Sequence, residues 1–212
     1  MNARWQDTPA AVLLRLLADL MVVNLLTLIC SFGVITVGAS LSAMYAVLLQ
    51  RERDEGMVAV IKTFFKAFGR NFLKATALEL ILVLVAGVAA GDLWFAVNSE
   101  QPLRTVYTVV GTVIGLLALL LFIMAFPQQA IYRNSMKNYL KNSVMLAMCA
   151  PGQLLLALLA WILPWYLAFS IEEIVTQFGF LYLLWGFSFP AWCTVKLLKK
   201  VFARTKQEEG EP

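Results

Sequence analysis

The sequence offers few residues whose type and spacing could support chemistry. It contains no histidine, and its three cysteines, Cys30, Cys149 and Cys193, are far apart in the chain. This spacing predicts neither a metal site nor a disulfide framework. The sequence also lacks a GxSxG nucleophile elbow, a phosphate-binding P-loop and paired carboxylates within an apolar run. We therefore expect no enzymatic activity, no metal ion and no cofactor.

Glu79 is the acidic residue of greatest interest, because it lies inside the apolar run of residues 75–91. An ionisable group within a membrane span is costly and is a functional candidate by default. We group Glu79 with Asn24, Thr36 and Gly38 as a candidate intramembrane polar site. Two interpretations stay open: a relay for a proton or cation, and polar contacts that only hold helices together.

The elements that position these residues follow from the composition. Of the 212 residues, 61% are hydrophobic and only 14% are charged, whereas soluble domains are about a quarter charged. Because a helix needs roughly 20 apolar residues to cross a bilayer, the sequence predicts one all-α polytopic membrane bundle. We expect one domain over residues 1–212, with about five spans near residues 14–35, 72–94, 105–126, 147–169 and 175–196.

The first apolar run is too long for one straight span. Gly33 and Gly38 flank a β-branched segment, so we expect a helix break between them. After the break, residues 39–52 are predicted to form a shorter helix that lies along the cytoplasmic interface. The alternative is a re-entrant helix, which requires that its backbone be buried in protein.

Two further segments are predicted to be interfacial amphipathic helices, residues 58–71 and 131–143. In the first, phenylalanines recur at helical spacing opposite a row of lysine and arginine. The second repeats this design, and the two align at one offset, which suggests an internal repeat. We expect the two helices to form a cytoplasmic platform that binds a partner through Lys62, Lys66, Arg70, Asn71, Arg133, Lys137 and Lys141.

Most of the 17 lysines and arginines lie in three segments, residues 51–74, 133–141 and 196–206. The positive-inside rule then predicts a cytoplasmic carboxyl terminus, and an odd number of spans places the amino terminus outside. Arg15 opposes this weakly, although it can pair with Asp19 one helical turn later. The basic residues adjoin apolar runs, so they indicate contact with lipid headgroups rather than with nucleic acid.

Residues 31–45 (SFGVITVGASLSAMY) and 64–76 (FFKAFGRNFLKAT) resemble the paired motifs of the YesL family. These are small bacterial membrane proteins of unassigned biochemical function. The resemblance implies a multi-pass protein of the bacterial plasma membrane, with a role near carbohydrate uptake or its sensing.

Two functional hypotheses follow. The first is an accessory or scaffold protein that docks transporter or sensor subunits through the basic platform. The second is a small-solute or ion transporter or channel with a site near Gly33, Gly38 and Glu79. Gly111 and Gly115 form a small-xxx-small pair in the third span, which also allows a homo-oligomer.

Overall fold

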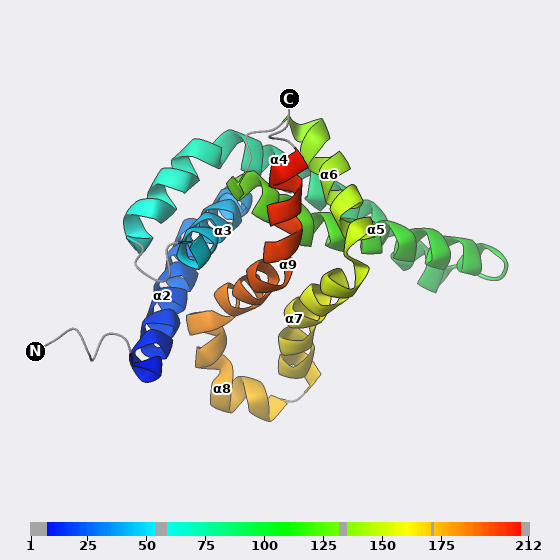
Figure 1. Cartoon of the computed structure of the whole chain (residues 1–212). Helices are drawn as coiled ribbons and strands as arrows, with labels where there is room; N and C mark the ends of the chain where they lie inside the picture. The colour runs from blue at the N-terminus through cyan, green and yellow to red at the C-terminus, as the bar shows by residue number, and fades with distance from the viewer. Residues whose placement is uncertain (1–7, 54–58, 132–134, 171, 209–212) are drawn as a thin grey trace, which may run out of the picture.

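The computed structural model of the chain describes residues 8–53, 59–131, 135–170 and 172–208, without the side chains of 172–178 and 200–208. Nearly all of these residues are helical, and none of them forms a strand, which confirms the predicted all-α bundle (Figure 1). The elements are α2 (Pro9–Cys30), the 3-10 turn η1 (Val34–Thr36), α3 (Val37–Arg53), α4 (Val60–Asn98), α5 (Leu103–Ile131), α6 (Met136–Cys149), α7 (Pro151–Ser170), α8 (Glu172–Trp185) and α9 (Ser188–Glu208).

Five described helices are long and apolar enough to cross a membrane, or six if one bent pair counts as a span. The five are Pro9–Cys30, Val34–Arg53, Val60–Asn98, Leu103–Ile131 and Pro151–Ser170. Residues 34–53 were not among the expected spans. The expected fifth span, residues 175–196, is instead the bent pair of α8 and α9, which meet at an angle of 51°.

The predicted break in the first apolar run is confirmed. Helix α2 ends at Cys30, and α3 begins at Val37 after the η1 turn. The Thr36 hydroxyl lies 2.5 Å from the carbonyl oxygens of both Cys30 and Gly33. The Gly33 carbonyl oxygen also accepts from the Thr36 backbone amide at 2.7 Å, so the hydroxyl is available to the Cys30 carbonyl at the end of the interrupted helix.

Helix α3 occupies the interior of the bundle, where it packs against α2, α4, α5 and α9 (Figure 1). Every residue from Gly38 to Tyr45 is buried, and the small side chains among them let neighbouring helices approach closely. The expectation of an interfacial helix over residues 39–52 is therefore wrong. The burial that the re-entrant alternative requires is present.

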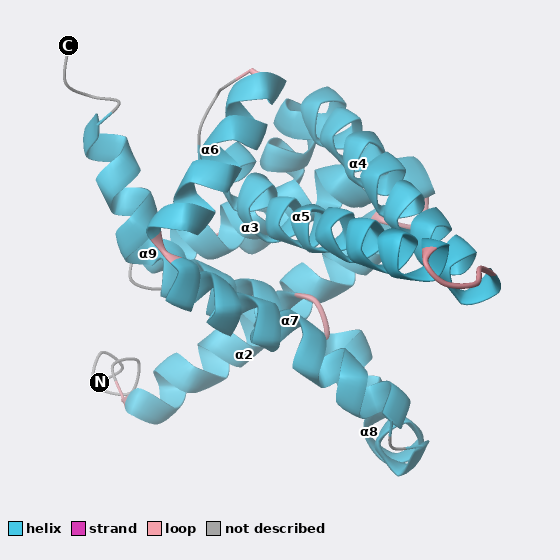
Figure 2. Cartoon of the chain, turned by 90° about the vertical axis from the view of Figure 1, so that its right-hand side faces the viewer, coloured by secondary structure: helices cyan, strands magenta, loops and turns pink. Residues whose placement is uncertain are grey.

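Helix α4 is a single helix of 39 residues, Val60–Asn98. The expected boundary near residue 71, between the interfacial helix 58–71 and the span 72–94, is therefore wrong. At about 1.5 Å per residue the helix measures about 58 Å, well beyond the roughly 30 Å of a bilayer core. It pairs with α5 in a hairpin whose turn lies away from the other helices (Figure 2).

The expected fourth span and the interfacial helix before it also have different ends. Helix α6 covers Met136–Cys149, where we expected residues 131–143, and residues 132–134 lie outside the described part. Residue Ala150 separates α6 from α7, so the expected span 147–169 is divided near its start. Pro151 is the first residue of α7, a position where the missing amide costs nothing.

Asn24 of α2 holds the bend between α8 and α9. Its side-chain amide donates to the carbonyl oxygen of Leu183 at 2.7 Å. Its side-chain oxygen accepts from the backbone amides of Phe187 and Ser188, both at 2.9 Å. One buried asparagine thus caps the first residues of α9 and binds the last turn of α8.

Candidate functional site

The carboxyl end of α3 is where several charged residues meet. Arg51 is buried and forms an ion pair with Asp19 of α2. The next residue, Glu52, contacts Lys199 of α9 at 3.5 Å. The expected pairing of Arg15 with Asp19 is therefore wrong, because Asp19 reaches across to α3 while the Arg15 side chain is exposed.

A hollow of about 590 Å³ opens beside this end of α3, between α3, α4 and the last turn of α5. We call it the basic pocket. It is lined by Ala46, Leu49, Gln50, Arg53, Ala59, Lys62, Thr63, Lys66, Ala67, Arg70, Ala130 and Ile131. Among these described residues four are cationic and none is acidic, so they attract an anionic group.

Helix periodicity explains how the cations converge. Lys62, Lys66 and Arg70 are four residues apart, so they share one face of α4. Arg53 approaches from α3, and Arg70 Nη2 donates to the carbonyl oxygen of Ala130 on α5 at 3.4 Å. Sequence reasoning predicted the α4 residues but left out Arg53, because its place opposite them depends on how the helices pack.

The remaining platform residues are divided. The side chains of Lys137 and Lys141 are exposed on α6 and do not line the basic pocket. Arg133 lies outside the described residues. Asn71 is buried, and its side-chain amide donates to Ser42 Oγ at 2.9 Å. Its observed contact is therefore structural.

A second polar feature joins α3 to the middle of α4. Glu79 Oε2 accepts a hydrogen bond of 2.8 Å from the backbone amide of Gly38, in the first turn of α3. A carboxylate at this place satisfies an otherwise unpaired helical amide and complements the helix dipole. With Asn71 and Ser42, this contact forms a polar seam between α3 and α4.

Gly38 permits this seam. A β-carbon at residue 38 would lie 2.5 Å from the carbonyl oxygen of Ala75 and 2.8 Å from Glu79 Cβ. The absence of a side chain therefore lets the backbones of α3 and α4 touch. Thr36 also lies at this break, and the neighbouring Thr76 donates to the Ile35 carbonyl oxygen at 3.0 Å.

Three of the four residues of the candidate intramembrane site thus lie together, and the fourth does not. Glu79, Gly38 and Thr36 meet at the amino-terminal end of α3. Asn24 instead bonds to residues 183, 187 and 188, so its inclusion was wrong. Its partners are more than 150 residues away in the chain, and no local pattern predicts such a pairing.

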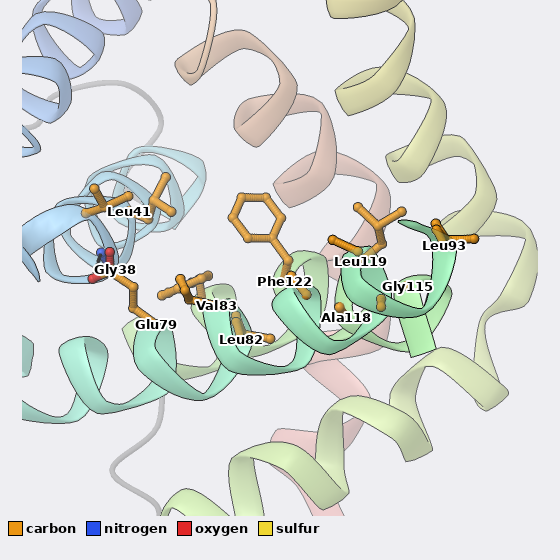
Figure 3. Close-up of a pocket in the computed structure, with 15 residues that line it drawn as sticks. Gly38, Leu41, Glu79, Leu82, Val83, Leu93, Gly115, Ala118, Leu119 and Phe122 are labelled. Carbon is orange, nitrogen blue, oxygen red and sulfur yellow. Dashed lines mark hydrogen bonds between the residues drawn. The ribbon is translucent and has the colours of Figure 1, made fainter. Parts of the chain in front are cut away.

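A cavity of about 510 Å³ extends from Glu79 along the groove between α3, α4 and α5. Figure 3 shows the Glu79 side chain directed toward Gly38 at one end, with Phe122, Ala118 and Leu93 farther along. Apart from Glu79, every residue that lines the cavity is apolar. We call it the Glu79 cavity.

One comparison with known proteins gives a match. Residues 20–93 match the model of a family described as a protein of unknown function, DUF624. The match covers the helix break, the polar seam and the α3 and α4 walls of the basic pocket. No curated protein and no solved structure matches the chain. The resemblance to the YesL family stays a prediction, because the matched description gives no such name.

Proposed function

We propose that this membrane protein is an accessory subunit that docks an acidic segment of a partner protein at the basic pocket. The observation that carries the proposal is the convergence of Arg53, Lys62, Lys66 and Arg70 on one hollow, whose lining includes no acidic residue in the described part of the chain. Charge-assisted hydrogen bonds from lysine and arginine to carboxylates are stronger than neutral ones. The proposal involves no catalytic step and no cofactor.

The extent of the positive surface favours a protein over a single lipid headgroup. Lys137 and Lys141 are exposed on α6, which packs against α5, the helix that closes the basic pocket. Anionic lipids attract basic segments too, at about 1 kcal/mol for each charge near the surface. A lipid, however, does not require the aliphatic floor formed by Ala46, Leu49 and Ile131. An acidic peptide with apolar side chains would contact both the cationic residues and this aliphatic floor.

The biological setting comes from the resemblance. If the likeness to the YesL family holds, the partner is a transporter or sensor subunit for carbohydrate uptake at a bacterial plasma membrane. The basic pocket then faces the cytoplasm, in line with the positive-inside rule. The carboxyl terminus is proposed to lie on the same side.

The position of the amino terminus needs a new proposal. We expected it outside, on the basis of five crossings with residues 39–52 at the interface. Ion pairs instead connect Asp19 and Lys199 to consecutive residues of α3, Arg51 and Glu52. These contacts support an arrangement in which α3 runs back along α2. We propose that α3 is an additional pass and that both termini lie on the face of the basic pocket.

Charge reversal tests partner docking. The Lys66→Glu and Lys137→Glu variants should lose a partner that co-purifies from native membranes with the wild-type chain. The matched control is Arg104→Glu, which makes the same charge change at an exposed residue near the α4–α5 turn. Retention of every partner by both platform variants would refute the proposal, as would equal loss in the control.

The second candidate function is transport through the region of Glu79. The cavity of about 510 Å³ beside this buried carboxylate is the observation that favours it. Protein in liposomes would then move a solute or ion, and Glu79→Gln would abolish the flux. Absence of flux from the wild-type protein would eliminate this candidate.

A further inference from the structure

Glu79 is a buried carboxyl group that has no cationic partner among the described residues. Its exposure is 8%, and none of their ion pairs includes it. Oε2 accepts from the Gly38 amide, but no hydrogen bond of the described residues involves Oε1. A buried carboxylate without a cation is costly, so it takes up a proton or pairs with a positive charge.

The structural role of Glu79 does not require this charge. Capping the first turn of α3 needs only an oxygen that accepts from the Gly38 amide. A glutamine at this position would supply such an oxygen from its neutral side chain. When it is ionised, Glu79 therefore adds a negative charge at the end of the cavity, beyond what the cap requires.

The cavity beside the carboxylate is wholly apolar otherwise. Its walls include Leu82 and Val83 of α4 and Leu119, Phe122 and Phe126 of α5 (Figure 3). The rings of Phe122 and Phe126 meet edge to face at 5.7 Å, and aromatic faces attract cations. Its volume of about 510 Å³ is that of an ordinary small-molecule site.

We propose that the Glu79 cavity binds lipophilic organic cations, with an ammonium or phosphonium centre beside the Glu79 carboxylate and an apolar body along α4 and α5. Neutral ligands of the same shape gain only the apolar contacts, and anions are repelled. The site is independent of partner docking, because Gly38 and Arg53 are at opposite ends of α3, about 22 Å apart along the helix axis.

Equilibrium binding of tetraphenylphosphonium to the full-length protein in lipid nanodiscs tests the proposal. The wild-type chain should bind this cation saturably. The Glu79→Gln variant should bind it about 30-fold more weakly, as for loss of one partner of a buried charge pair. Neutral triphenylphosphine oxide should bind both proteins equally, because it lacks the charge.

A second variant keeps the test decisive if Glu79→Gln folds poorly. Ala90 lines the cavity but is exposed, so Ala90→Phe should fill the space without disturbing the core. It should weaken binding of both the cation and the neutral probe. Absence of saturable binding to the wild-type protein, as when a lipid chain fills the cavity permanently, overturns the proposal. Equal affinity of the cation for wild type and a folded Glu79→Gln protein also overturns it.

Discussion

Replacement of Gly38 by alanine should destabilise the whole bundle, although the change adds only one methyl group. The new β-carbon would lie 2.5 Å from the Ala75 carbonyl oxygen and 2.8 Å from Glu79 Cβ. The first of these neighbours is backbone, so relief requires α3 and α4 to move apart. That movement lengthens the hydrogen bond of 2.8 Å between the Gly38 amide and Glu79.

The expected cost combines two effects. Overpacking of a close helix contact costs about 1–3 kcal/mol. Loss of a hydrogen bond to a charged acceptor costs about 1.5–3 kcal/mol. The two effects overlap, so we expect a loss of about 2–5 kcal/mol in the free energy of unfolding. For a chain of this size, each kcal/mol lowers the melting temperature by roughly 2–4 °C.

Thermal unfolding in one detergent, followed by circular dichroism, is the assay. The matched control is Gly69→Ala on α4, where an added β-carbon meets nothing within 4 Å. Alanine stabilises a helix interior relative to glycine by about 0.5–1 kcal/mol, so the control should melt at the same temperature or slightly higher. A Gly38→Ala protein as stable as the control would refute the close approach of α3 and α4.

Three further predictions concern the other contacts of α2 and the chain ends. Arg51→Met should lower the free energy of unfolding in urea by about 2–4 kcal/mol, because it leaves Asp19 without its cation. Adding Asp19→Leu should restore part of the loss, and an unchanged urea midpoint of Arg51→Met would contradict the ion pair. Asn24→Ala should lower the free energy of unfolding by about 1–3 kcal/mol, since it removes the acceptor of the Phe187 and Ser188 amides. The hydrogen exchange rate of those two amides should rise, and protection equal to that in the wild type would exclude the cap. A membrane-impermeant reagent should label single cysteines near both termini from the same face of the membrane. Labelling from opposite faces would instead indicate an odd number of membrane crossings.

Sequence reasoning succeeded where a local pattern carried the information. The break between Gly33 and Gly38 was predictable, because two glycines flank a β-branched segment in a run too long for one span. The first span was expected to reach residue 35, whereas α2 already ends at Cys30. The amphipathic start of α4 was equally visible in its spacing. The expected end of this helix near residue 71 was wrong. The sequence has no helix cap and no proline there that would stop the helix, and α4 continues to Asn98.

The errors arose where long-range packing decides the outcome. Residues 38–43 are all buried and, apart from Leu41, all small, a composition that favours close helix packing on several sides. We interpreted the helix by its short length instead and placed it at the interface. The bend at Gly186 depends on Asn24, more than 150 residues earlier, and Arg53 meets the α4 lysines only through the fold.

Photo-crosslinking from within the basic pocket tests the central claim most directly. A photoreactive amino acid at position 63, which lines the pocket, would be activated in native membranes, and the products identified by mass spectrometry. We expect a cross-link to an acidic segment of a partner protein. The link should be lost with Lys66→Glu, kept with Arg104→Glu, and regained when acidic residues of the partner segment are changed to lysine. Cross-links to lipid alone, or a protein cross-link that is indifferent to charge reversal in the pocket, would contradict the account.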